Sequence, residues 1–234
     1  MWAVEGKLQI DAVVFADTGS ELPSTYATVA AVKDKVNEAG IPFYTVKADH
    51  PPLDVDYRER GMLPMVGVVW CTKKFKVGPV RQKVRELVWA RYKSLKEPKP
   101  WATAILGITT DESHRQHPSD ILWSSNEYPL IEELWNREQC IGYLRENYPE
   151  LVVSKSGCFC CPYQGPKSWA KLRREHPKLF AKARAMEEAA KANGVKRGLW
   201  GERSIIAFDS DVTLEDFGVE IEDSTCDPGG GCFI

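Results

Sequence analysis

The chain has 234 residues, of which 43% are hydrophobic and 27% charged, and its formal net charge is −2. This composition excludes a disordered, collagen-like or disulfide-dense protein, and the length suits one large domain or one domain with a small appendage. No run approaches 18 consecutive apolar residues, which excludes a membrane-spanning helix. The first seven residues lack the basic start and apolar run of a signal peptide, so we expect an intracellular protein. Its seven cysteines are then thiols, metal ligands or redox groups rather than disulfides.

Charge is segregated along the chain. Residues 73–99 hold ten Lys and Arg and two acids, and residues 167–197 hold ten Lys and Arg and three acids. Residues 202–227 hold nine acids and one Arg. Each run on its own is typical of a solvated face, but two basic runs in one domain favour an anionic ligand, either a nucleotide or a nucleic acid.

The first half of the chain shows a strand–helix–strand order. An apolar run over residues 8–16 predicts a buried strand that leads into Asp17. A helix is predicted over residues 23–39, with Gly40 as its stop, and a second strand over residues 41–46. Residues 49–64 are rich in Pro, Asp and Arg and are predicted to form a loop.

The second half continues the alternation. A helix is predicted over residues 79–95, a buried strand over residues 101–108, and two further helices over residues 131–147 and 168–192. Alternating strands and helices predict an α/β fold with a parallel sheet covered by helices on both faces. Ligands of such sheets bind at the carboxyl ends of the strands, which are the positions of Asp17 and Asp111.

A cysteine knuckle is the sharpest local signal in the sequence. The spacing of Cys158 and Cys161, between Gly157 and Pro162, places two thiolates within reach of one metal ion. Cys71 and Cys140 are the candidates to complete four-coordination, although both also suit small buried hydrophobic residues. Four thiolates fit a [4Fe-4S] cluster or a zinc ion, and the ligand types do not choose between them. A redox dithiol that includes Cys160 is a third interpretation.

Several short segments, taken in order, resemble one family. They are Phe15-Ala16-Asp17-Thr18-Gly19-Ser20-Glu21 with Thr25-Tyr26, Cys71-Thr72 with Lys76 and Pro79, Gly107-Ile108-Thr109-Thr110-Asp111-Glu112-Ser113 with Arg115, Tyr128-Pro129-Leu130 with Trp135 and Cys140, and Lys155-Ser156-Gly157-Cys158 with Cys161-Pro162. Together they are similar to the phosphoadenosine phosphosulfate (PAPS) reductase family, particularly its short phage versions and the related DNA phosphorothioation proteins. The resemblance covers roughly residues 8–190.

This resemblance implies an adenine nucleotide α-hydrolase-like fold and an adenine nucleotide, ATP or PAPS, as substrate. The nucleotide-binding residues that it implies are Asp17, Thr18, Gly19, Glu21, Lys76 and Gly107. Asp111, Glu112 and Arg115 would line the far side of the cleft as catalytic residues, with His114 assisting proton transfer. A guanidinium group such as that of Arg115 suits a phosphate or sulfate.

One departure from the family concerns its phosphate loop. The family begins with a strand and a Ser/Gly-rich loop whose backbone N–H groups hold phosphates, and no such loop precedes Asp17 here. Residues 1–8 are predicted to be the end of the helix that follows that loop, so the chain is expected to be truncated relative to the family or to have lost the loop. Cys226 and Cys232 also do not reproduce the terminal Glu-Cys-Gly pattern of the reductases.

The sequence therefore leaves three hypotheses. The first is a cytoplasmic enzyme of sulfur transfer or reduction, in the bacterial host cell if it is phage-encoded, with DNA or RNA held by residues 73–99 and 167–197. The second is a non-catalytic module that binds nucleotide or nucleic acid, and the third is a domain held together by structural zinc. The predicted organisation is a nucleotide-binding domain over residues 1–200, whose cysteine-rich part is 140–165, followed by an acidic extension over residues 201–234.

Overall fold

The computed structural model describes residues 1–68, 70–92, 100–151, 156–200 and 204–206, so the predicted extension and its two cysteines lie almost wholly outside the described residues. The elements are β1 (Val13–Ala16), α1 (Pro23–Glu38), β2 (Phe43–Val46), α2 (Leu53–Glu59), the π-helix η1 (Thr72–Val77), α3 (Gly78–Arg91), β3 (Ala102–Ile105), the 3-10 segment η2 (Thr110–Arg115), β4 (Ser124–Glu127), α4 (Pro129–Glu132), α5 (Arg137–Asn147), α6 (Pro166–Glu175) and α7 (Pro177–Ala192). Among the described residues, no helix combines the length and apolarity needed to cross a lipid bilayer.

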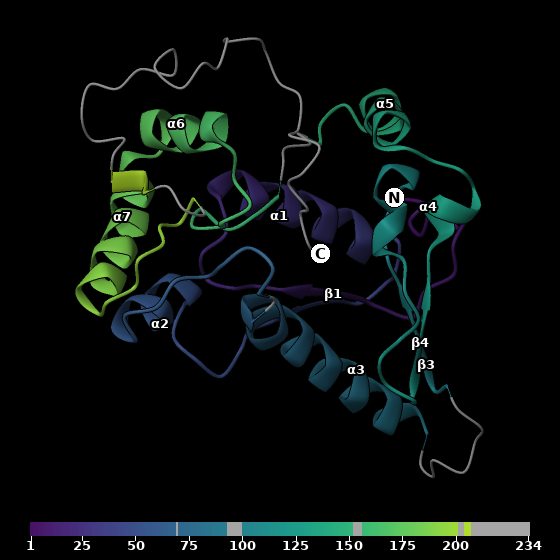
Figure 1. Cartoon of the computed structure of the whole chain (residues 1–234). Coiled ribbons are helices and arrows are strands. Elements are labelled where there is room, and N and C mark those ends of the chain that lie inside the picture. Colours follow the sequence, from purple (N-terminus) through teal and green to yellow (C-terminus); the bar gives the residue numbers. More distant parts are fainter. Residues whose placement is uncertain (69, 93–99, 152–155, 201–203, 207–234) are drawn as a thin grey trace.

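The strands form small parallel sheets, which confirms a mixed α/β structure. β1 pairs with β2 in the register Val13↔Phe43, and β3 pairs with β4 in the register Ala102↔Ser124. The expectation of one continuous sheet differs from the described structure, in which β1–β2 and β3–β4 are separate two-stranded sheets (Figure 1). β4 has the polar sequence Ser-Ser-Asn-Glu, so apolar patterning could not have identified it.

Two predictions of local structure need correction at the start of the chain. Residues 1–8 form turns rather than a helix end, and the side chain of Glu5 accepts hydrogen bonds from the hydroxyls of Tyr143 and Tyr148. The predicted loop over residues 49–64 contains α2, whose first turn carries Asp54 and Asp56. Acidic side chains at a helix N-terminus are favoured by the helix dipole, so Asp54 and Asp56 mark the start of a helix although the preceding prolines suggest a loop.

Two long helices predicted from periodicity are each broken. The helix expected over residues 131–147 is interrupted at Leu134, which has φ +58°, and α5 begins at Arg137, with Asn136 as its N-cap in a capping box with Gln139. The helix expected over residues 168–192 is divided into α6 and α7 by Pro177, because the residue before a proline is driven out of the helical region and His176 has ψ +61°.

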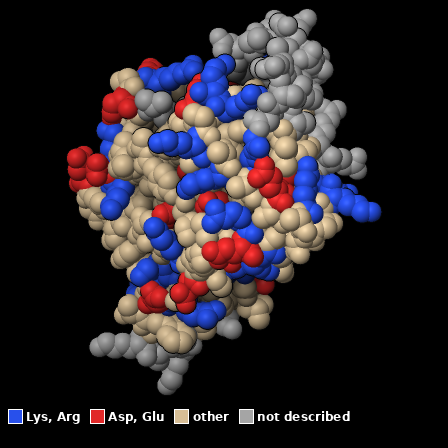
Figure 2. All heavy atoms as spheres, turned by 90° about the vertical axis from the view of Figure 1, so that its left-hand side faces the viewer, with Lys and Arg blue, Asp and Glu red and all other residues tan. Residues whose placement is uncertain are grey.

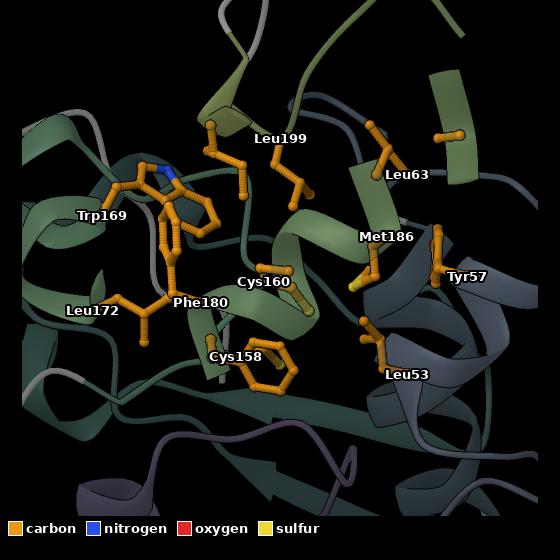
Figure 3. Close-up of a cluster of buried hydrophobic side chains, with 14 of the residues drawn as sticks. Leu53, Tyr57, Leu63, Cys158, Cys160, Trp169, Leu172, Phe180, Met186 and Leu199 are labelled. Atoms are coloured by element: carbon orange, nitrogen blue, oxygen red, sulfur yellow. The ribbon is translucent and has the colours of Figure 1, made fainter. Parts of the chain in front are cut away.

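The core lies where α2, α6 and α7 surround the cysteine knuckle. α2 and α6 both pack against α7, and Cys158 and Cys160 are buried with Trp169 and Met186 (Figure 3). The apolar faces of these helices thus cover the knuckle, and the segment after β1 contacts it through a β-bridge between Glu21 and Cys158. This packing sets the surroundings of the candidate site.

Candidate functional site

The turn that follows β1 carries the first group of predicted site residues. Gly19 has φ +73°, and a Cβ added there would lie 2.9 Å from the Cβ of Pro52, so the turn requires glycine. Asp17 Oδ1 accepts hydrogen bonds from the backbone N–H of Gly19 at 2.8 Å and from the hydroxyl of Tyr26 at 2.7 Å. Lys47, which directly follows β2, places Nζ 3.1 Å from Asp17 Oδ2.

These contacts determine the charge of Asp17. Its burial acts to raise the pKa, but the hydrogen bonds from Tyr26 and Gly19 and the charge of Lys47 lower the pKa of Asp17 below its ordinary value. Asp17 is therefore an ionised carboxylate at neutral pH that organises the turn. Because Asp17 Oδ1 accepts its hydrogen bonds from Gly19 and Tyr26, the carboxylate holds the shape of the turn, and we regard Asp17 as a positioning residue.

The turn is joined directly to the cysteine knuckle. Glu21 and Cys158 form an antiparallel β-bridge, and the backbone N–H of Phe159 donates to the carbonyl oxygen of Ser20 at 2.9 Å. Glu21 Oε1 accepts from the Thr18 hydroxyl at 3.0 Å and from the Cys158 thiol at 3.3 Å, and Thr18 Oγ1 lies 3.3 Å from Cys158 Sγ. All three side chains are buried, so one small polar cluster connects two segments about 140 residues apart.

Lys76 supplies a positive charge to this cluster from the π-helix η1. Its Nζ lies 3.6 Å from Glu21 Oε1, and its side chain is 24% exposed. Burial acts to lower the pKa of Lys76, but the interactions with Cys158 and Glu21 outweigh it and raise the pKa. Single π-helical turns occur frequently at functional sites, and this one places a protonated amine beside a buried carboxylate.

The cysteines fall into two places. Cys71 and Cys161 interact electrostatically with Lys76, so they lie near Cys158 and Cys160. Burial raises the pKa of Cys158 and of Cys160 well above the ordinary value for a thiol, with Glu21 adding to the effect at Cys158, so both are protonated at neutral pH.

Cys140 belongs to a different neighbourhood. It lies on α5, where burial first and Asp111 second raise its pKa. No group of three or more His, Cys, Asp or Glu side chains in the described part of the chain is arranged to hold a metal ion. As arranged, the four predicted ligands do not fit a zinc site or an iron–sulfur cluster. Cluster or zinc binding stays a prediction, and we derive no chemical step through a metal.

The second group of predicted residues follows β3 in η2. Arg115 Nη1 pairs with Glu112 Oε1 at 2.8 Å, and Asp111 Oδ2 accepts from the backbone N–H of Arg137 at 2.6 Å, at the N-terminus of α5. His114 is exposed, and a Cβ added to Gly107 would meet no atom within 4 Å. The contacts of η2 thus tie it to the start of α5, whereas those of Asp17, Thr18 and Glu21 tie the first turn to the knuckle.

Sequence reasoning missed two partners of the first group. Ser20 Oγ donates to Asp54 Oδ1 at 2.7 Å and accepts from the backbone N–H of Asp54 at 3.0 Å, which fastens the turn to α2. Lys47 was also missed, although its place directly after the second strand puts it at the same sheet edge as Asp17. Asp54 could have been found only by recognising α2.

Comparison with known proteins adds no relative: no protein-family model, curated protein or solved structure matches this chain.

Proposed function

We propose that this chain binds an adenine nucleotide at the carboxyl ends of its strands and acts in sulfur transfer or reduction, in the manner of the PAPS reductase family that its motifs resemble. The observation that carries the proposal is that Glu21, in the turn after β1, contacts both Cys158 of the cysteine knuckle and Lys76 of η1. This arrangement brings an anion-attracting amine, an ionisable carboxylate and a thiol to the end of a parallel strand, where ligands of α/β folds bind.

The cluster has the groups that acid–base chemistry at sulfur needs. The Cys158 thiol already donates its hydrogen bond to Glu21 Oε1, so the carboxylate is placed to accept that proton. The ammonium group of Lys76 would then stabilise the thiolate, since it lies beside the same carboxylate. In the nucleotide-free chain the thiol stays protonated, and transfer of its proton to Glu21 is the step that would give the thiolate.

Titration calorimetry of the full chain with ATP and with PAPS tests the proposal. The variant Lys76→Met removes the ammonium group and keeps the length of the side chain, and we expect it to weaken nucleotide binding about tenfold or more. Lys47→Gln removes a cation that is 67% exposed and should weaken binding roughly fivefold without affecting folding. Lys33→Gln, an exposed lysine on the neighbouring helix α1, is the matched control and should bind as the unsubstituted chain does.

Two results would refute the nucleotide proposal. One is the absence of binding heat for both nucleotides at millimolar concentration, and the other is equal affinity for the unsubstituted chain, the Lys47 variant and the Lys33 variant. If Lys76→Met fails to fold, as judged by circular dichroism, the pair Lys47→Gln and Lys33→Gln still decides the question.

A second candidate function is a nucleotide-binding module without turnover. The observation that favours it is the burial of Cys158 and Cys160 as protonated thiols, which is typical of unreactive structural cysteines. Alkylation of the native chain by iodoacetamide, located by peptide mass spectrometry, separates the two functions. Modification of Cys158 in the native chain supports the enzyme, whereas full protection of Cys158 with and without nucleotide supports the module. Metal analysis of the purified chain tests the predicted iron or zinc independently.

A further inference from the structure

The two basic runs of the sequence differ in how many of their described cations are paired with acids. In the first run, five cations of the described residues 73–92 lie within ion-pair distance of acids. The pairs are Lys74 with Asp56 at 2.9 Å, Lys76 with Glu21 at 3.6 Å, Arg81 with Asp120, Lys83 with Glu86 at 2.8 Å and Arg91 with Asp11 at 2.6 Å. Five of the seven described cations of the first run are therefore paired within the molecule.

The second run keeps a surplus of positive charge on the surface. Its ten cations lie on or just after α6 and α7, and of its three acids Glu187 is completely buried. Lys171 and Arg174 share Glu175, and Arg184 pairs with Glu188. Five cations have no acidic partner among the described residues, namely Arg173, Lys178, Lys182, Lys196 and Arg197. Figure 2 shows Lys and Arg side chains spread over this side of the molecule, where α6 and α7 lie.

Two arginines of this surface, Arg173 and Arg184, line a hollow. It has a volume of about 410 Å³ and is lined by Arg173 and Arg184, by Pro177, Phe180 and Ala181, and by the carboxylate-bearing Glu188. Arg184 Nε donates to Glu188 Oε1 at 2.8 Å, which holds the guanidinium group at the hollow. Two half-buried guanidinium groups beside one hollow offer a phosphate group more hydrogen-bond donors, in fixed planes, than scattered surface lysines do.

We infer that the face formed by α6 and α7 binds the phosphodiester backbone of a nucleic acid, with one phosphate in the hollow between Arg173 and Arg184. The lysines of α7 then contact neighbouring phosphates. Phe180, the aromatic residue of the hollow, is only 5% exposed, so base stacking is not expected there and binding should be independent of sequence. The inference rests on the proposed function in one respect: it names the surface that would bind a nucleic acid if that nucleic acid is the acceptor of sulfur. Binding of nucleic acid to this surface does not require a nucleotide at the turn after β1.

Fluorescence anisotropy of the full chain with a labelled single strand of about 20 nucleotides, and with the corresponding duplex, tests the inference. Affinity should fall steeply between about 50 and 200 mM salt. The double variant Arg173→Gln/Arg184→Gln should weaken binding about tenfold or more and, because the two arginines share one phosphate, reduce the log–log salt slope for the single strand by about 0.7. A second double variant, Lys178→Gln/Lys182→Gln, changes only exposed side chains and should act in the same direction.

The matched control lies on the other basic run. Arg85→Gln/Arg91→Gln on α3 removes the same charge, and we expect less than about a twofold change in affinity. Absence of binding at about 50 mM salt, affinity that is insensitive to salt, or equal weakening by the α3 control would each overturn the inference. If the arginine variant fails to fold, comparison of the nucleic-acid affinity of the lysine variant with that of the α3 control still tests the inference. ATP titration of the lysine variant should match the unsubstituted chain, so failure of this inference is distinguishable from failure of the nucleotide proposal.

Discussion

The buried carboxylate of Glu187 is predicted to hold the end of the described chain onto α7. Glu187 is fully buried, and its Oε2 accepts from the backbone N–H groups of Leu199 at 2.9 Å and Ile205 at 3.1 Å. Its Oε1 accepts from the hydroxyl of Ser204 and lies 3.1 Å from Nζ of Lys191. One side chain thus satisfies two backbone donors that are buried away from water.

The magnitude follows from those two donors. Glu187→Ala leaves both N–H groups without an acceptor, and each costs about 1–3 kcal/mol, so we expect a loss of about 2–6 kcal/mol in the free energy of unfolding. Glu187→Gln keeps the shape and one acceptor oxygen but removes the charge, and we expect a loss of about 2 kcal/mol. For a chain of this size, the alanine variant should lower Tm by roughly 10 °C.

Urea unfolding followed by tryptophan fluorescence measures these losses. Glu188→Gln is the matched control, because Glu188 is exposed and its ion pair with Arg184 lies at the surface, so its effect should stay below about 0.5 kcal/mol. If both Glu187 variants unfold within about 1 kcal/mol of the unsubstituted chain, the reasoning that the carboxylate satisfies the two buried donors is refuted.

Two further predictions concern the turn after β1 and the start of the chain. Gly19→Ala should lower the free energy of unfolding by about 1–3 kcal/mol because of its positive φ and the close approach of Pro52, whereas Gly107→Ala should be neutral; equal unfolding midpoints would contradict this. Hydrogen bonds from Lys7, Tyr143 and Tyr148 lower the pKa of Glu5 to about 2 from 4.5. Its stabilisation is therefore present above pH 4.5 and lost as pH falls toward 2. Glu5→Gln should thus lose less stability on acidification than the unsubstituted chain, as measured by urea midpoints at two pH values.

Local sequence signals predicted the elements whose ends are marked by single residues. The helix α1 begins at Pro23 and ends before Gly40, which has φ +75°, and its bounds agree with prediction within one residue. The same kind of signal was present at Pro177 but was overridden by the apolar periodicity on both sides. β4 was missed because its polar residues pair with β3 through backbone groups, which apolar patterning does not report.

The candidate site was predicted in part. The resemblance named Asp17, Thr18 and Glu21, and separately Lys76 and Cys158, but it did not say that these side chains touch. It also grouped Cys140 with the knuckle, whereas the fold places this residue on α5 beside Asp111. Which cysteines meet depends on how helices pack, and nothing in the spacing of Cys140 could have decided it.

The sequence by itself determined where charge and helix breaks lie along the chain, because proline, glycine and runs of lysine act on their immediate neighbours. It could not determine which charges would remain on the surface. The partners of Lys74 and Arg91 are 18 and 80 residues away in sequence, so only the tertiary structure showed that five of the seven described cations of the first basic run are paired. The second run, on α6 and α7, retains surface charge because its three acids pair with only four of its ten cations among the described residues, and five cations there have no acidic partner.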